Sequence, residues 1–134
     1  MKDIDKILEM LNWNNNTEVQ KEGLMLAKEV ECINSFFQPV SKNVGKNQWE
    51  NCAKVIFDRE DDELKSYLVK MYMWLKDINW PGATIIAKRI YNFKDKKTKL
   101  NIEEKMKTIA KSLNDDDWLY YLEHYDEFID TKIY

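Results

Sequence analysis

The sequence is poor in the residues that interrupt helices and in those that build catalytic or metal sites. It has three glycines, two prolines, two cysteines and a single histidine. Glycines at positions 23, 45 and 82 alone cannot form a glycine-rich phosphate loop. Any site that requires two histidines is excluded because His124 has no second histidine to act with. The scarcity of glycine and proline also argues against a turn-rich β-sandwich.

Long apolar runs and an excess of positive charge are absent too. No stretch approaches the roughly 20 apolar residues of a membrane span, and the first residues, MKDIDKILEMLNW, are acidic where a signal peptide would be apolar. The formal net charge of −3 provides no general attraction for nucleic acid. We therefore expect a cytoplasmic protein that does not associate with membranes. We expect Cys32 and Cys52, which fall in no metal-binding or redox spacing, to be reduced and buried.

What is present is typical of a helical globule. Hydrophobic residues make up 44% of the chain and charged residues 34%, and 134 residues suffice for one hydrophobic core. We expect a single domain over residues 1–134. Apolar residues recur three and four positions apart along most of the chain, and alternation typical of strands is not sustained. This periodicity predicts an all-α fold with about seven helices.

The helix boundaries follow from capping residues and from proline. A T-x-x-Q pattern from Thr17 to Gln20 predicts a helix start, and apolar residues continue at helical spacing to Phe37, before Pro39. We predict another helix with Pro81 at its first position. A further helix is predicted from Asn101, with an inward face made of Ile102, Met106, Ile109, Ala110 and Leu113.

Four tryptophans give a faint internal repeat. Trp13, Trp49, Trp80 and Trp118 are separated by 36, 31 and 38 residues, which is in the range of helix-pair repeats. The spacing favours antiparallel hairpins in a short HEAT-like right-handed stack. A compact helical bundle of another topology is the alternative.

The candidates for chemistry do not form a catalytic set. His124 lies in the segment LYYLEHYDEF, and the sequence nominates no nucleophile to act with it. The carboxylates at 58–63 and 115–117 fall at predicted helix starts, where the helix dipole favours negative charge. We therefore expect no enzyme, no catalytic residue, no metal ligand and no cofactor.

Charge is unevenly distributed near the end of the chain. Residues 88–111 contain nine Lys or Arg against three Asp or Glu, whereas residues 114–130 contain seven acidic residues and no Lys or Arg. Solvated helix faces explain such charges. Alternatively, Asp115, Asp116 and Asp117 attract a basic protein partner. Nucleic-acid binding by the lysine-rich segment 94–99 is disfavoured, since that segment lacks the aromatic residues of a stacking platform.

The most distinctive string is WLKDINWPGA, residues 74–83. One helix must end before Pro81, and Gly82 allows a close approach of another group. Packing and capping explain this string. The alternative is a partner-binding edge that contains Trp74, Asp77, Asn79 and Trp80, since tryptophan is enriched at binding hot spots.

This string, together with WENCAKV at 49–55 and Tyr67-Leu68, resembles an uncharacterised bacterial domain family of unknown function with a WL-x-D-x-NWPGA core. The resemblance covers residues 46 to 93 and leaves out the lysine-rich segment and the acidic tail. It implies a helical, HEAT-like fold and supplies no activity, cofactor or catalytic residue. Small domains of this kind also resemble immunity-type proteins that neutralise bacterial toxins.

Two functional hypotheses follow. The first is a non-enzymatic protein–protein interaction module, of the toxin-neutralising type, whose partner is another protein. The alternative is a small-ligand-binding protein or an enzyme with a site near Asp77, Asn79, Trp80 and His124.

Overall fold

The computed structural model describes residues 3–39 and 44–129, and within these ranges the chain is helical with no strand. The all-α prediction is confirmed. The longer helices and short turns of helix are α1 (Ile4–Met10), α2 (Thr17–Ala27), η1 (Asn34–Phe36), α3 (Lys46–Phe57), α4 (Asp61–Leu64), η2 (Lys65–Tyr67), α5 (Leu68–Trp74), α6 (Ala83–Tyr91), α7 (Lys96–Ser112), α8 (Asp116–His124) and η3 (Tyr125–Phe128).

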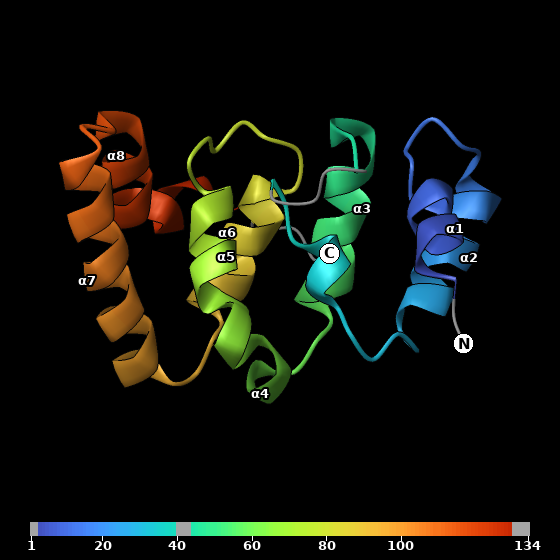
Figure 1. The fold of residues 1–134 in the computed structure, drawn as a ribbon, viewed down its shortest axis with the longest axis horizontal. Helices are drawn as coiled ribbons and strands as arrows, with labels where there is room; N and C mark the ends of the chain where they lie inside the picture. The colour runs from blue at the N-terminus through green and yellow to red at the C-terminus, as the bar shows by residue number, and fades with distance from the viewer. Residues whose placement is uncertain (1–2, 40–43, 130–134) are drawn as a thin grey trace.

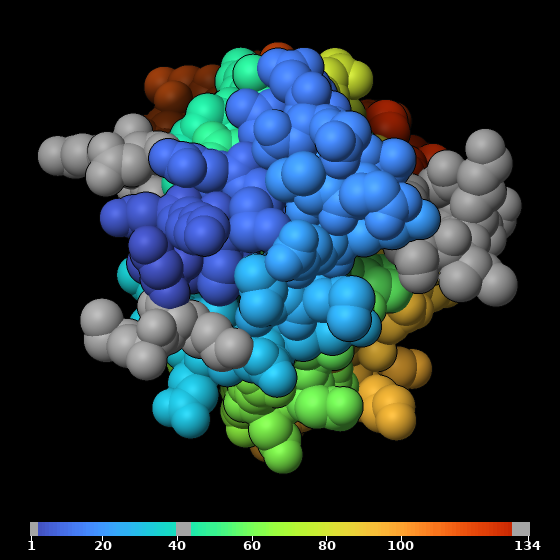
Figure 2. All heavy atoms as spheres, turned by 90° about the vertical axis from the view of Figure 1, so that its right-hand side faces the viewer, coloured from blue at the N-terminus to red at the C-terminus, as the bar shows by residue number. Residues whose placement is uncertain are grey.

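The helices form a row along the long axis of the molecule (Figure 1). The hairpin of α1 and α2 lies at one end, followed by α3, then α5 with α6, and finally α7 with α8. Each layer packs mainly on its neighbours, α3 on α6 and α5 on α7. Figure 2 shows α1 and α2 covering the first end of the row. The four tryptophans from which a repeat was predicted do not occupy equivalent places, since Trp13 is 42% exposed and Trp118 is 1% exposed. The HEAT-like right-handed stack therefore stays a prediction.

Side-chain caps fix where several helices begin. Asp3, Asn16, Asp95 and Asp115 each accept a hydrogen bond from the backbone amide three residues ahead. The predicted cap at Thr17 was wrong by one residue, since Asn16 caps α2. The predicted start at Asn101 was also wrong: the Asp95 cap lets α7 begin at Lys96, so most of the lysine-rich segment is helical.

The helix predicted to run from Thr17 to Phe37 ends at Ala27 instead. The Arg59 guanidinium donates hydrogen bonds to the carbonyl oxygens of Ala27 and Val30, both at 2.8 Å. These bonds satisfy carbonyls that a continuing helix would have used. The chain therefore turns after Ala27, and η1 returns Phe36 to the core, where it is fully buried.

Polar side chains of α3 attach the first hairpin to the rest of the row. Asn51, which is 4% exposed, donates to the Leu11 carbonyl at 2.7 Å and to Oε1 of Gln20 at 2.9 Å. Gln48 donates to the Leu8 carbonyl at 2.7 Å. Buried donors of this kind are costly when unpaired, so they fix how the hairpin packs on α3.

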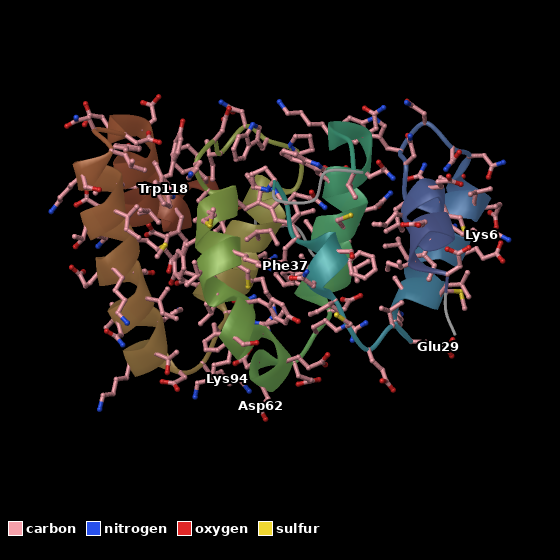
Figure 3. All side chains as sticks on the ribbon, viewed as in Figure 1. Lys6, Glu29, Phe37, Asp62, Lys94 and Trp118 are labelled. Carbon is pink, nitrogen blue, oxygen red and sulfur yellow. The ribbon has the colours of Figure 1, made fainter. Side chains whose placement is uncertain are left out.

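The core runs through all layers, and its labelled members Phe37 and Trp118 point inward in Figure 3, whereas Asp62 and Lys94 lie at the lower edge. Two residues predicted to face inward are exposed, Ile109 of α7 at 42% and Leu113, just after this helix, at 59%. Glu103 of α7 is instead buried, with 7% exposure. Cys52 is buried as expected, but Cys32 is exposed. In the described residues, no helix is both long and apolar enough to cross a membrane.

Candidate functional site

The WLKDINWPGA string forms the joint between α5 and α6. The indole N–H of Trp74 donates to the Pro81 carbonyl at 3.1 Å, which ties the end of α5 to the start of α6. The Trp49 ring of α3 packs edge-on against Trp74 and Trp80, with centroids 6.2 and 5.5 Å apart. Three tryptophans therefore hold α3, α5 and α6 together at one point.

Gly82 is required at this joint for two reasons. Its φ of 84° lies in the left-handed region, and it is the N-cap residue of α6. A Cβ at this position would lie 2.7 Å from the Ala53 Cβ and 2.9 Å from the Trp49 carbonyl oxygen. The prediction that Pro81 opens the helix was wrong, since α6 begins at Ala83 after this glycine.

The four residues of this string that were predicted to bind a partner differ in exposure and in their contacts. Trp74 is fully buried and so offers no surface to a partner. Trp80 is half-buried against Trp49, and Asn79 is exposed. Oδ1 of Asp77 accepts a hydrogen bond from the Asn79 amide at 2.9 Å, so this carboxylate shapes its own turn and does not cap α6.

The acidic run 115–117 opens α8. Oδ1 of Asp115 accepts from the Trp118 amide at 3.0 Å and caps the helix, while Asp116 and Asp117 are exposed in the first turn. The Trp118 ring is buried below them, and its N–H donates to the Tyr72 carbonyl at 3.1 Å. This anchor fixes the start of α8 against α5.

Asp77 and Asp117 come close to the same side chain although they are far apart in sequence. Burial, followed by the charges of Asp117 and Asp77, raises the pKa of Tyr121. Lys76 of the same loop lies over the Trp118 ring, 4.8 Å from its centroid. The loop after α5 and the start of α8 thus form one surface.

Aromatic rings continue this surface along α8 and η3. We define the tyrosine face as Tyr120, Tyr121, His124 and Phe128. Tyr120 lies 4.5 Å from the His124 ring and 6.1 Å from Tyr121, and Tyr121 lies 5.5 Å from Phe128, between centroids. Tyr120 is 48% exposed, and its hydroxyl donates to Glu127 at 3.4 Å. The tyrosine face is therefore an accessible aromatic cluster with carboxylates at its margin.

Sequence reasoning missed a second polar cluster, which lies around Glu103 of α7. Oε1 of this buried carboxylate accepts hydrogen bonds from the hydroxyls of Tyr72 at 3.0 Å and Tyr125 at 2.7 Å. Burial and the neighbouring Glu103 charge raise the pKa of both tyrosines, so both remain protonated donors. The available signal was the position of Glu103 three residues before Met106, on the buried side of α7.

A cavity of about 530 Å³ lies beside this cluster. Its walls come from the end of α6, from α7 and from α8 with η3. The lining residues are Tyr91, Lys96, Lys99, Leu100, Glu103, Lys107, Leu122, Glu123, Tyr125 and Asp126.

An enzyme or small-ligand site near Asp77, Asn79, Trp80 and His124 stays a prediction, and the structure gives the contacts of its residues. Trp80 packs on Trp49, whereas His124 packs on Tyr120 and lies 3.7 Å from Glu127. Burial raises the pKa of Cys52 to about 12, so this thiol is not a nucleophile near neutral pH. Among the described residues, no group of three or more His, Cys, Asp or Glu is placed to hold a metal ion.

Comparison with known proteins places the chain in a family. A model of the Domain of unknown function (DUF5071) matches residues 44–129, which is more than half of the chain. The chain belongs to the DUF5071 family. No curated protein and no solved structure matches it. The DUF5071 match extends beyond the predicted resemblance at 46–93, so α7 and the acidic α8 lie inside the family domain, while α1 and α2 precede it.

Proposed function

We propose that this DUF5071 protein is a non-enzymatic binding module that holds a basic protein partner on its tyrosine face. The observation that carries the proposal is the exposed aromatic cluster of α8 and η3 with carboxylates around it. Tyr120 is 48% exposed and its hydroxyl donates to Glu127, and the charges of Asp117 and Asp77 act on Tyr121.

Aromatic side chains surrounded by polar groups are the usual composition of an interface hot spot. Tyrosine contributes a large contact area and loses little conformational entropy on binding. The acidic margin would accelerate the approach of a positively charged partner and align it. Asp116 and Asp117 serve this purpose, whereas Asp115 is engaged in capping α8.

A toxin that is neutralised by such binding meets this description of the partner, which is how we interpret the likeness to immunity-type proteins. We further propose that the protein works in a bacterial cytoplasm. Both cysteines are unpaired and Cys32 is exposed, as suits a reducing compartment.

Affinity capture from the native host tests the proposal with matched variants. Tyr120→Ala and Asp117→Asn change exposed side chains of the proposed interface, and we expect each to weaken retention of a defined basic partner at least tenfold. Asp62→Asn is the control, because Asp62 is exposed at the opposite edge of the molecule (Figure 3). Retention that is equal for all three variants would contradict the proposal.

A further inference from the structure

The cavity beside Glu103 has features of a small-ligand site that is separate from the tyrosine face. Its volume of about 530 Å³ falls within the range of about 300–1,000 Å³ that is typical of such sites. Five residues of α7 line it, Lys96, Lys99, Leu100, Glu103 and Lys107. Lys96, Leu100, Glu103 and Lys107 are three or four residues apart, which places them on one side of the helix, and Lys99 is next to Leu100.

Glu103 supplies a fixed acceptor at this cavity. Both tyrosine hydroxyls donate to Oε1, which holds the carboxylate in place between α5, α7 and η3. Glu103 also lines the cavity, so its second oxygen, Oε2, is available to a donor from a bound molecule. A carboxylate that is only 7% exposed is stabilised by a further donor, and a positively charged donor gives the strongest hydrogen bond.

Positive groups line the same cavity. Lys99 donates to the carbonyl oxygens of Ile90 and Tyr91 at 3.0 and 3.2 Å, so its ammonium is held at the end of α6. Lys96 at the start of α7 is exposed. Lys107 lies 3.5 Å from Glu104, a surface pair that contributes little stability and leaves the lysine able to bind elsewhere.

The acidic and apolar residues of the cavity indicate which other groups the ligand carries. Glu123 and Asp126 add two carboxylates, so the lining has three acidic and three basic side chains. A ligand with one sign of charge would meet like charges, whereas a ligand with both signs finds a partner for each. Leu100, Leu122 and Tyr91 provide apolar surface between these groups.

We propose that this cavity binds a free amino acid with an apolar side chain. The ligand's ammonium donates to Oε2 of Glu103, its carboxylate accepts from Lys96 or Lys107, and its side chain packs on Leu100 and Leu122. The hydroxyls of Tyr72 and Tyr125 hold the Glu103 carboxylate in position and donate no hydrogen bond to the ligand.

Three probes that share a phenyl ring on a two-carbon chain test the requirement for both charges. L-phenylalanine carries both groups, 2-phenylethylamine lacks the carboxylate, and 3-phenylpropanoate lacks the ammonium. At 10 mM we expect L-phenylalanine alone to raise the Tm of the full chain by about 2–5 °C, since a ligand of the folded state stabilises it. Equal shifts with all three probes, or no shift with any, would overturn the proposal.

Two variants locate the binding on the protein. Glu103→Gln keeps an oxygen that can accept from both tyrosines but puts an N–H₂ group in place of Oε2, and we expect the Kd for L-phenylalanine in calorimetry to rise at least tenfold. Lys96→Ala changes an exposed side chain, so it tests the site even if Glu103→Gln is unstable, and we expect a Kd about three- to tenfold higher. Lys105→Ala, on an exposed side of α7 away from the cavity, is the matched control. An unchanged Kd in Lys96→Ala and in folded Glu103→Gln would refute the site.

The same calorimetry separates this site from the proposed protein interface. Tyr120→Ala should leave the Kd for L-phenylalanine unchanged, because Tyr120 does not line the cavity. Loss of amino-acid binding in Tyr120→Ala would show that the two sites are not separate and would contradict the assignment.

Discussion

Two glycines of the chain occupy the same position relative to a helix and differ in their surroundings. Gly45 is the N-cap residue of α3, with φ −85°, and Gly82 is the N-cap residue of α6, with φ 84°. The nearest atom to an added Cβ is 3.8 Å away at Gly45 and 2.7 Å away at Gly82. Only Gly82 is therefore constrained by both conformation and space.

We predict that Gly82→Ala lowers the free energy of unfolding by about 2–5 kcal/mol, since left-handed backbone strain and overpacking against Ala53 add. Gly45→Ala should lower it by less than about 1 kcal/mol. Urea unfolding of both variants measures the difference. Similar values for the two variants would show that the tryptophan joint adapts to a Cβ.

The two roles of the acidic run 115–117 can also be separated residue by residue. We predict that Asp115→Ala destabilises the protein by about 0.5–2 kcal/mol, because the Trp118 amide loses its cap. Asp115→Asn should change stability by less than about 0.5 kcal/mol, since asparagine caps equally well. Thermal unfolding of the pair checks this. Equal losses in both variants would mean that charge, and not capping, is what Asp115 contributes.

At the scale of elements, two arginines join helix ends along one edge of the molecule. Arg59 binds the end of α2, and Arg89 of α6 donates to the Arg59 carbonyl at 2.8 Å and pairs with Asp61 of α4 at 2.5 Å. The Lys94 amide donates to the other oxygen of Asp61 at 3.0 Å. This chain of contacts keeps the short helix α4 in place although it has only four residues.

The Asp61–Arg89 pair predicts how stability depends on pH. Burial opposes ionisation of Asp61, but hydrogen bonds from Lys94 and Arg89 outweigh it and lower its pKa below the ordinary value. The pKa of Asp61 is therefore lower in the folded than in the unfolded state. Ionised Asp61 stabilises the fold fully above the unfolded pKa of ~3.9, and this stabilisation is lost as the pH falls through the folded pKa.

We therefore expect Asp61→Asn to destabilise the protein by about 1–3 kcal/mol at pH 7, since a buried guanidinium loses its charged partner. The difference from the native chain should shrink as the pH is lowered below about 4. Urea unfolding at several pH values measures it, with exposed Asp62→Asn as control. A difference that is constant with pH would contradict the assigned role of Asp61.

The helices of this chain could be predicted from the sequence, whereas several of their boundaries could not. The apolar spacing predicted the helices of this chain, because burying one side requires residues three and four apart. The early end of α2 was missed because its carbonyls are satisfied by Arg59, which lies 32 residues further along the chain. In the candidate site, the acidic residues of α8 were predicted, but their meeting with Asp77 near Tyr121 depends on how α5 and α8 pack. The Glu103 cluster likewise joins three elements that no local pattern relates.

At the scale of the molecule, layers that contact mainly their neighbours should differ in local stability. We predict that amide hydrogens of α3, α5 and α6, which lie within the row, exchange most slowly with solvent. Those of α1 and α2, which cover one end of the row, should exchange sooner (Figure 2). Native-state hydrogen exchange measured by NMR or mass spectrometry tests this. Uniform protection across all layers would indicate one cooperative unit.

The buried amide of Asn51 has a consequence for the family as a whole. Asn51 lies inside the matched region, yet its hydrogen-bond acceptors, Leu11 and Gln20, lie in the hairpin that precedes that region. A relative without that hairpin would leave this donor without those acceptors. Across an alignment of relatives, asparagine at this position and the preceding hairpin should therefore be inherited or replaced together.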